Sequence, residues 1–149
     1  MKIKNIMDDI KDLEEYAKIC QVTWGDKKTD EELKKYTKEK VKRILKEDKV
    51  ISILGLLDND KLISFISLFK YDGDEMKNLT PWYATMYVKE EYRNKGYSKI
   101  LNDAILNEAK KKGYNRIYLK SNLVNYYEKF GAKYIKTLNN KEKLYYIDL

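Results

Sequence analysis

The sequence predicts an α/β fold, a mixed twisted sheet flanked by helices, in a single domain over residues 1–149. Three observations predict this fold. Two segments with helical spacing come first, three strand-like segments then follow one another, and the third of these strands begins a strand–helix–strand unit. With 149 residues, 43% of them hydrophobic, the chain is long enough to bury one core.

Two amphipathic helices are expected in the N-terminal third. Between Met7 and Cys20 apolar side chains recur every three or four residues, and the pair Trp24-Gly25 closes this helix. We expect Trp24 to anchor the helix end in the core rather than to line an acceptor site. The second helix begins at a capping box, residues 29–32, and runs to Glu47. Its apolar face contains Leu33, Tyr36, Ile44 and Leu45.

A three-stranded meander is expected in the middle of the chain. Val50–Leu57 is rich in β-branched residues and too short for an average helix. After a turn at residues 58–61 the chain returns along Leu62–Tyr71, and a polar loop, Asp72–Leu79, leads to a third strand, Thr80–Val88. Apolar residues occupy adjacent as well as alternate positions, so we expect this sheet to be covered on both faces.

A parallel strand–helix–strand unit is expected next. The helix starts at Tyr97 and ends at the C-terminal signals Lys110–Gly113, and the strand Asn115–Lys120 follows it. A crossover helix between strands makes the two strands parallel, with a right-handed connection.

The rest of the chain adds smaller elements. We expect a short helix that ends at Gly131, then a hairpin of Lys133–Leu138 with Leu144–Asp148. Lys2–Lys4 is the candidate for a short first strand. The short helix would place on one face Leu123, Tyr126, Tyr127 and Phe130.

Composition excludes several kinds of chemistry. The absence of His excludes a Ser-His-Asp triad, a Cys-His nucleophile and His-based metal sites. The acidic clusters at residues 58–60 and 72–74 lack the spacing of a calcium loop and are typical of turns. We therefore predict no metal. The single Cys20 excludes an internal disulfide, and its place on the apolar face of a helix argues against a nucleophile.

The net charge of +7 suggests an anionic partner such as coenzyme A, a nucleic acid or a membrane surface. Of the 31 basic residues only Arg43, Arg93 and Arg116 are Arg, and the Lys residues are dispersed, which favours a solvated surface over base readout. We expect neither a nucleic-acid nor a membrane partner. One Cys and an acidic N-terminal segment predict a cytoplasmic protein, and the sequence is compatible with a homodimer.

The most informative stretch joins the third strand to the helix after it. The strand ends at Val88, and the charged connector Lys89–Lys95 leads to Gly96. The first N–H groups of a helix have no internal partner and carry partial positive charge, so this end can hold a phosphate. Gly96 lets the backbone approach a ligand or adopt a positive φ, and Arg93 and Lys95 add full positive charges. Taken alone, the loop fits an ordinary solvated turn equally well.

This loop resembles the acetyl-CoA loop of the GNAT superfamily, the GCN5-related N-acetyltransferases, and the chain is similar to small single-domain members. The family loop has Gln or Arg, two residues, Gly, one residue, then Gly or Ala. Here it reads Arg93-Asn94-Lys95-Gly96-Tyr97-Ser98. Ser98 departs from the pattern, but Ser is small and we expect cofactor binding to survive. The resemblance implies the GNAT fold, with acetyl-CoA as cosubstrate.

A second segment resembles another GNAT signature. The run Tyr126-Tyr127-Glu128-Lys129 and Gly131 fit it, whereas Ala132 stands where an aromatic residue is usual. Two motifs in the expected order are more specific than either alone. The resemblance implies that Tyr127 is the general acid, because a phenol with a pKa of about 10 holds its proton at neutral pH. The alternative is that Tyr127 only packs against Leu123 and Phe130 in the core.

The resemblance also implies the cofactor contacts. In the family the strand before the loop diverges from the next parallel strand and leaves backbone N–H groups open to the cofactor, which falls here on Met86, Tyr87 and Val88. Asn122, at a strand end, is a candidate cap or cofactor contact. The full set of predicted cofactor-binding residues is Met86, Tyr87, Val88, Arg93, Asn94, Lys95, Gly96, Tyr97, Ser98 and Asn122.

The general base is not identified by the sequence. Acetyl transfer needs an amine that loses a proton, a donor for the oxyanion and a proton for the departing thiolate. Without His the base is a carboxylate, or the amine arrives deprotonated. The acidic residues near the loop or in the polar segment are Glu90, Glu91, Asp72, Asp74 and Glu75. A solvated surface charge is the favoured interpretation of each, so the sequence assigns none of them as the base.

Three functions are compatible with these observations. The first is acetyl-CoA-dependent N-acetyl transfer by direct attack of a primary amine, on a small molecule or on a protein or peptide N-terminus. The second is a non-catalytic acyl-CoA-binding module with a regulatory role. The third, a basic RNA-associated protein, predicts clustered Arg and exposed aromatic residues, whereas the Lys residues here are dispersed.

Overall fold

The computed structural model describes residues 1–73 and 76–149, and the predicted α/β fold is confirmed. Three α-helices and seven strands make up most of the described chain. The helices are α1 (Ile10–Trp24), α2 (Asp30–Lys46) and α3 (Tyr97–Lys111), with 3₁₀ turns η1 (Ile6–Asp8), η2 (Glu90–Tyr92) and η3 (Tyr127–Phe130). The strands are β1 (Lys2–Asn5), β2 (Val50–Asp58), β3 (Lys61–Phe69), β4 (Trp82–Val88), β5 (Arg116–Ser121), β6 (Lys133–Thr137) and β7 (Lys143–Asp148).

The strands form one sheet in the order β1-β2-β3-β4-β5-β7-β6. Every neighbouring pair is antiparallel except β4 and β5, which α3 connects as a crossover and which are therefore parallel. The predicted first strand is present as β1, paired with β2. The meander β2-β3-β4, the parallel unit and the β6–β7 hairpin also agree with the sequence analysis.

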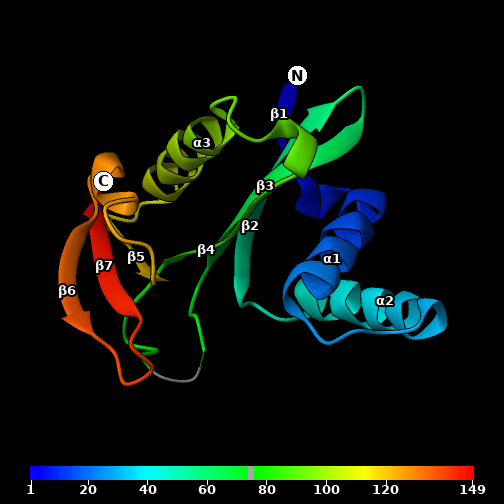
Figure 1. Cartoon of the computed structure of the whole chain (residues 1–149), viewed down its shortest axis with the longest axis horizontal. Helices are drawn as coiled ribbons and strands as arrows, with labels where there is room; N and C mark the ends of the chain where they lie inside the picture. Colours follow the sequence, from blue (N-terminus) through cyan, green and yellow to red (C-terminus); the bar gives the residue numbers. More distant parts are fainter. Residues whose placement is uncertain (74–75) are drawn as a thin grey trace.

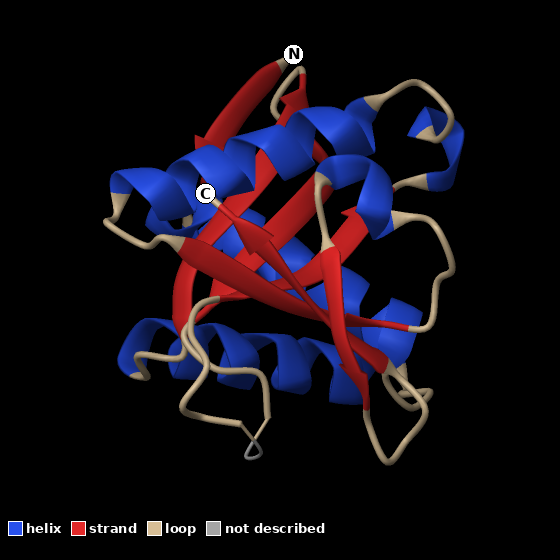
Figure 2. Ribbon diagram, turned by 90° about the vertical axis from the view of Figure 1, so that its left-hand side faces the viewer, coloured by secondary structure: helices blue, strands red, loops and turns tan. Residues whose placement is uncertain are grey.

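Helices cover both faces of the sheet, α3 on one side and α1 with α2 on the other (Figures 1 and 2). This arrangement explains why β3 is buried along nearly its whole length. Leu101, Ile105 and Ala109 of α3 belong to one apolar cluster, and Leu13 and Ile44 of α1 and α2 belong to a second cluster. Burial of each large aliphatic side chain contributes about 1.5–3 kcal/mol, so both helical layers stabilise the sheet.

Three details of the predicted elements are wrong. Helix α1 begins at Ile10, three residues later than expected, because Asp9 caps it by accepting hydrogen bonds from the N–H groups of Lys11 and Asp12. Leu45 is 52% exposed, and Val41 takes the buried place beside Ile44. An α2 face of Thr37, Val41 and Ile44 follows helical spacing more closely than the predicted set.

The predicted short helix before Gly131 is the third error. Only residues 127–130 form a helical turn, the 3₁₀ turn η3, and Leu123 is exposed. The reason is Asn125, whose φ of 56° lies in the left-handed region and interrupts a right-handed helix. In the part of the chain that is described, none of the helices has the length and hydropathy needed to cross a membrane.

Candidate functional site

The site is built where β4 and β5 separate. In the described chain their ladder consists of the single pair Trp82 and Tyr118, near the start of β4, and the rest of β4 has no partner in β5. The two groups of strands spread apart beside α3 in Figure 1. Residues 84–88 are accordingly half-buried, whereas the first two residues of β4 are buried. An unpaired strand edge inside a sheet offers backbone N–H and C=O groups to a ligand.

Strand β4 also contains a bulge where it pairs with β3. The register with β3 shifts between Phe65 and Ser67, so that two residues, Thr85 and Met86, stand opposite one. Thr85 has a φ of 48°, which is strained for a β-branched residue. The bulge directs Thr85 toward the face that α1 covers, where its hydroxyl meets Tyr16.

A cluster of hydroxyl groups holds the bulge in place. The Tyr16 hydroxyl lies 2.9 Å from Ser67 Oγ and 3.2 Å from Thr85 Oγ1, and Thr85 also donates a hydrogen bond to Ser67. Tyr16 and Ser67 are buried, and burial raises the pKa of the Tyr16 phenol well above its usual value. These bonds compensate the strain at Thr85. The sequence contains no signal for the cluster, because its members come from three separate elements.

The loop after β4 has the conformation that the motif implied. Asn94 and Gly96 have φ values of 62° and 83°, both in the left-handed region. An added Cβ on Gly96 would meet nothing within 4 Å, so the space beside the loop is open. In α1 and α2 the first turns are capped, by Asp9 and by the predicted Thr29–Glu32 capping box. Among the described residues no side chain caps α3, and its first turn has no acidic residue.

An open cavity of about 530 Å³ lies in front of this helix end. Eight of the ten residues predicted to bind a cofactor line it: Met86, Tyr87, Val88, Arg93, Asn94, Gly96, Tyr97 and Ser98. The structure does not bring the other two to the cavity. Lys95 is exposed and lies over the Tyr92 ring, and Asn122 is exposed at the end of β5.

Two cations line this cavity, which we call the loop cavity. Arg93 donates a hydrogen bond from Nε to the Val88 carbonyl at 2.8 Å, which fixes the guanidinium beside the end of β4. Lys129 and Tyr126, which come from the second motif, also line the cavity, and Lys129 Nζ lies 4.2 Å from the centroid of the Tyr126 ring. Two cations and an uncapped helix N-terminus can together hold an anionic group such as a pyrophosphate.

The position of Trp24 contradicts the prediction that this residue anchors the helix end in the core. Its side chain is 54% exposed, and it lines the loop cavity together with Thr23. The Trp24 ring packs edge-on against Tyr87, with 6.2 Å between ring centroids. Gly25 ends α1 as expected, but this end of the helix points toward the cavity rather than into the core.

Tyr127 lies in a second, smaller cavity between the separated strands. This cavity of about 180 Å³ also contains Met86, which lines the loop cavity as well, so the two spaces are adjacent. The Tyr127 ring packs edge-on against Tyr83 and Tyr126, whereas Leu123 is exposed. Burial raises the pKa of Tyr127 to about 12, with a smaller effect of Tyr126, so its phenol keeps its proton at neutral pH.

One of the carboxylates considered for the general base, and not assigned to it, lines the same small cavity. Asp72 lines it together with Tyr127, and its carboxylate lies 3.6 Å from Lys120 Nζ. Glu90 and Glu91 belong to η2 and are exposed. Asp74 and Glu75 lie outside the described residues. The described residues contain no group of three or more acidic, His or Cys side chains that could hold a metal.

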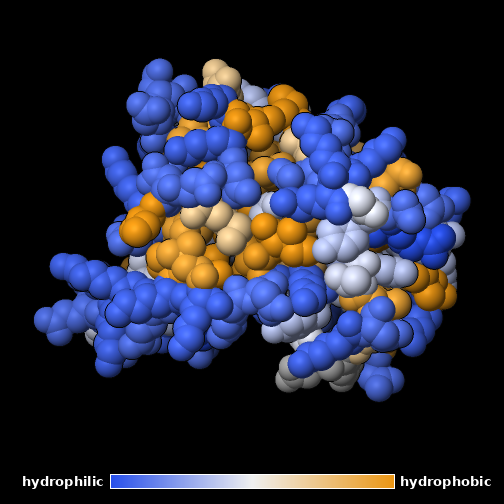
Figure 3. All heavy atoms as spheres, turned by 180° about the vertical axis from the view of Figure 1, so that it is seen from behind, coloured by the Kyte–Doolittle hydropathy of each residue, from blue (hydrophilic) through white to orange (hydrophobic). Residues whose placement is uncertain are grey.

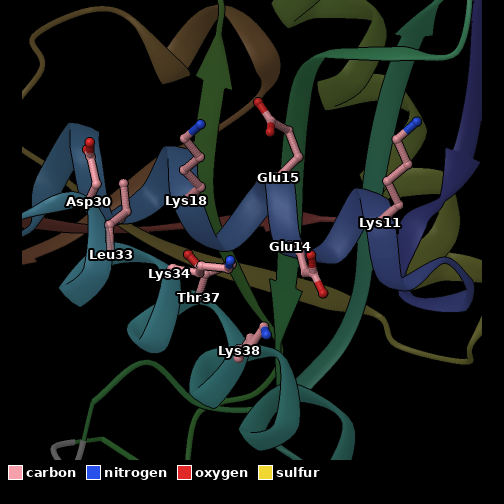
Figure 4. A pocket seen from close by; sticks show the side chains of 9 residues that line it. All are labelled: Lys11, Glu14, Glu15, Lys18, Asp30, Leu33, Lys34, Thr37 and Lys38. Carbon is pink, nitrogen blue, oxygen red and sulfur yellow. The ribbon is translucent and has the colours of Figure 1, made fainter.

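A further cavity of about 440 Å³ lies between α1 and α2 (Figure 4). Its side chains carry mixed charges, for example Glu14 and Lys18, and Figure 4 shows Glu14 and Glu15 pointing in opposite directions. It shares no lining residue with the loop cavity or the small cavity. We therefore place the site at the separated strands.

A mixed sheet with one separated parallel pair, and with an uncapped helix N-terminus beside that separation, defines the class of acyl-CoA N-acyltransferase folds. The comparisons give the particular family. A model described as the acetyltransferase (GNAT) family matches residues 10–132. The chain therefore belongs to the GNAT acetyltransferase family, as the two motifs indicated.

Solved structures of this fold match almost the whole chain. PaiA N-acetyltransferase from Thermoplasma acidophilum, in complex with coenzyme A, has a TM-score of 0.64 at 21% identity, covering 99% of this chain and 98% of that one. Aminoglycoside 6'-N-acetyltransferase from Enterococcus faecium has a TM-score of 0.71 at 16% identity, covering 99% and 97%. The ribosomal-protein-S18-alanine N-acetyltransferase from Escherichia coli has a TM-score of 0.67 at 13% identity, covering 99% and 92%. A search of curated proteins finds no match.

Proposed function

We propose that the protein is an acetyl-CoA-dependent N-acetyltransferase that acts on a primary amine. The observation that carries this proposal is the uncapped N-terminus of α3, which opens with left-handed Asn94 and Gly96 onto an unpaired strand edge. In α1 and α2, capping side chains accept hydrogen bonds from the corresponding N–H groups. Leaving them open on α3 fits a ligand with an anionic group, and coenzyme A carries a pyrophosphate.

The residues present fit this cosubstrate in three ways. Arg93 and Lys129 provide charge on the side of the pyrophosphate. The open backbone of Met86, Tyr87 and Val88 can pair with the amides of the pantetheine arm, as an added strand would. The small cavity lined by Tyr127 then receives the acetyl end. Bound acetyl-CoA supplies the acetyl thioester, whose C–S bond breaks as a C–N bond forms to the amine.

Tyr127 supplies the proton that the leaving sulfur needs. Because its pKa is about 12, the phenol is protonated at neutral pH and can donate from Oη to the thiolate, then regain a proton from solvent. The amine loses its own proton to solvent or to a carboxylate. Asp72 lines the same cavity as Tyr127 and is our candidate for that role.

The fold does not select the acceptor. The names of two structural neighbours denote transfer to an aminoglycoside and to an alanine of a ribosomal protein. Acceptors of very different size thus occur on one fold, and for this chain the amine has to be inferred from its own residues.

Calorimetry tests the proposal directly. Acetyl-CoA and free coenzyme A should bind with similar affinity, and ATP, which has phosphates without the pantetheine arm, should bind much more weakly. Release of free thiol on addition of amines, followed with a thiol reagent, then measures turnover. If acetyl-CoA does not bind at millimolar concentration, the proposed function is wrong.

A further inference from the structure

A basic groove lies between α2 and strands β2–β4, on the face opposite α3. Its volume is about 360 Å³, and Tyr16, Tyr36 and Phe69 form aromatic walls. The groove meets the site described above, because Phe69 and Thr85 line both the groove and the small cavity that contains Tyr127. The groove is therefore adjacent to the cavity that contains Tyr127.

The charge in this basic groove is mainly positive. Its ionisable side chains, apart from Tyr, are the cations Lys40, Arg43 and Lys49 and the anion Glu47. In the described part of the molecule none of the three cations forms an ion pair with a carboxylate. This differs from Lys120 in the small cavity, which pairs with Asp72.

The three cations instead lie over the aromatic walls. A ring face attracts a cation without cancelling its charge, in contrast to a carboxylate. The groove therefore has a positive potential that an anionic ligand group can neutralise. The distances from cation to ring centroid are 5.8 Å for Lys40 Nζ and Tyr16, 5.9 Å for Arg43 Cζ and Tyr36, and 5.1 Å for Lys49 Nζ and Phe69.

From this arrangement we infer that the acceptor is an amine that also carries a carboxylate. The carboxylate binds Lys40, Arg43 and Lys49, the body of the acceptor packs on the aromatic walls, and the amine extends past Thr85 toward Tyr127. This inference rests on the proposed function and follows the same transfer step. It excludes diamines and other polycations as preferred acceptors, since a second ammonium would lie against three unpaired cations.

A matched set of amines tests the inference. The compounds 4-(aminomethyl)benzoate, benzylamine and 4-(aminomethyl)benzylamine share ring and amine and differ only in a negative, neutral or positive group. We expect kcat/KM to be about tenfold higher for the benzoate than for benzylamine, and lowest for the diamine. An aliphatic set, 5-aminopentanoate, pentylamine and 1,5-diaminopentane, makes the test independent of ring shape.

Charge reversal in the groove provides the matched variants. Arg43→Glu should remove the preference for the carboxylate and raise the relative rate with the diamine about tenfold. Lys42→Glu makes the same charge change on the neighbouring residue of α2, which is exposed and does not line the groove, and it should leave the preference unchanged. Lys49→Gln, outside the helix, repeats the test if Arg43→Glu fails to fold.

The outcomes separate this inference from the proposed function. Three outcomes would overturn the inference and leave the proposed cofactor binding intact. They are equal rates for the three amines of a set, a preference for the diamine, and no acetylation of any of them by a protein that binds acetyl-CoA. An equal effect of Lys42→Glu and Arg43→Glu would also overturn it, because the effect would then come from net charge. Failure to bind acetyl-CoA would instead overturn the proposed function.

Discussion

At the scale of single residues, the acetyl transfer proposed above depends on which of two adjacent phenols faces the reacting atoms. Tyr126 lines the loop cavity, and Tyr127 lines the small cavity between the strands. The packing role considered for Tyr127 is also present, since its ring contacts Tyr83 and Phe130. The two roles are compatible, because packing holds the ring while its hydroxyl stays available.

Tyr127→Phe should lower kcat about a hundredfold and leave the affinity for acetyl-CoA unchanged. The ring packing is kept and only the proton donor is lost, and general acid catalysis contributes about 10²–10⁴-fold. Thiol release measures kcat, and calorimetry measures affinity. The exposed Tyr134→Phe is the control. A fall in kcat for Tyr126→Phe and not for Tyr127→Phe would show that the acid is assigned to the wrong phenol.

The residues that sequence could identify are those that belong to a contiguous motif. Arg93, Gly96 and Tyr127 were predicted because motif order fixes their place. Thr85 and Trp24 were not, because a bulge and the direction of a helix end depend on contacts between distant segments. A positive φ at a β-branched residue in particular contradicts its local preference, so no local pattern can predict it.

At the scale of elements, helix α3 has a left-handed glycine at each end. Gly96 precedes its first residue and Gly113 follows its last turn, with φ values of 83° and 93°. Neither position has any atom within 4 Å of an added Cβ. The two glycines are therefore equivalent in backbone strain, and they differ in what lies nearby.

Gly96→Leu should abolish acetyl-CoA binding in calorimetry, whereas Gly113→Leu should leave it unchanged. Each change costs about 1–2 kcal/mol for a left-handed L-residue, so both variants should lose similar stability in urea. Only at Gly96 does the new side chain occupy the space in front of the helix N-terminus. Equal affinities of the two variants would contradict the placement of the cofactor at this loop.

The elements themselves were largely predictable from sequence. The periodicity of the strands and the capping signals of α2 and α3 agree with the structure within a few residues. The short helix before Gly131 was predicted wrongly because the apolar spacing of residues 123–130 has the helical period, while Asn125 adopts a conformation that no spacing reveals. Asn is one of the few residues that tolerates it.

At the scale of the whole molecule, the buried phenols make the folded protein less stable at alkaline pH. Burial raises the pKa of Tyr16 and Tyr83 well above 10.0, and that of Tyr127 to about 12. In the unfolded chain these groups lose their protons near pH 10, before the folded protein does. Their contribution to the free energy of unfolding is therefore complete below pH 10 and is lost as pH rises through the folded-state values.

The free energy of unfolding should be level from about pH 7 to 9 and fall above about pH 10, by up to about 1.4 kcal/mol per pH unit for each buried phenol. Urea denaturation followed by circular dichroism at a series of pH values measures it. Tyr83→Phe removes one phenol and should make the decline shallower. A free energy that stays level to about pH 11 in the parent protein would contradict this assignment.

The molecule also separates two tasks in space. Figure 3 shows apolar side chains gathered in the middle of one face and bordered by hydrophilic ones. Among the described residues, the loop cavity and the basic groove have no lining residue in common. The small cavity shares Met86 with the loop cavity, and Phe69 and Thr85 with the basic groove. With the acceptor and cofactor sites proposed above, substitutions in α2 can therefore alter the range of acceptors while cofactor binding is inherited unchanged. A lineage with this architecture can acquire new substrates by gradual change of one wall.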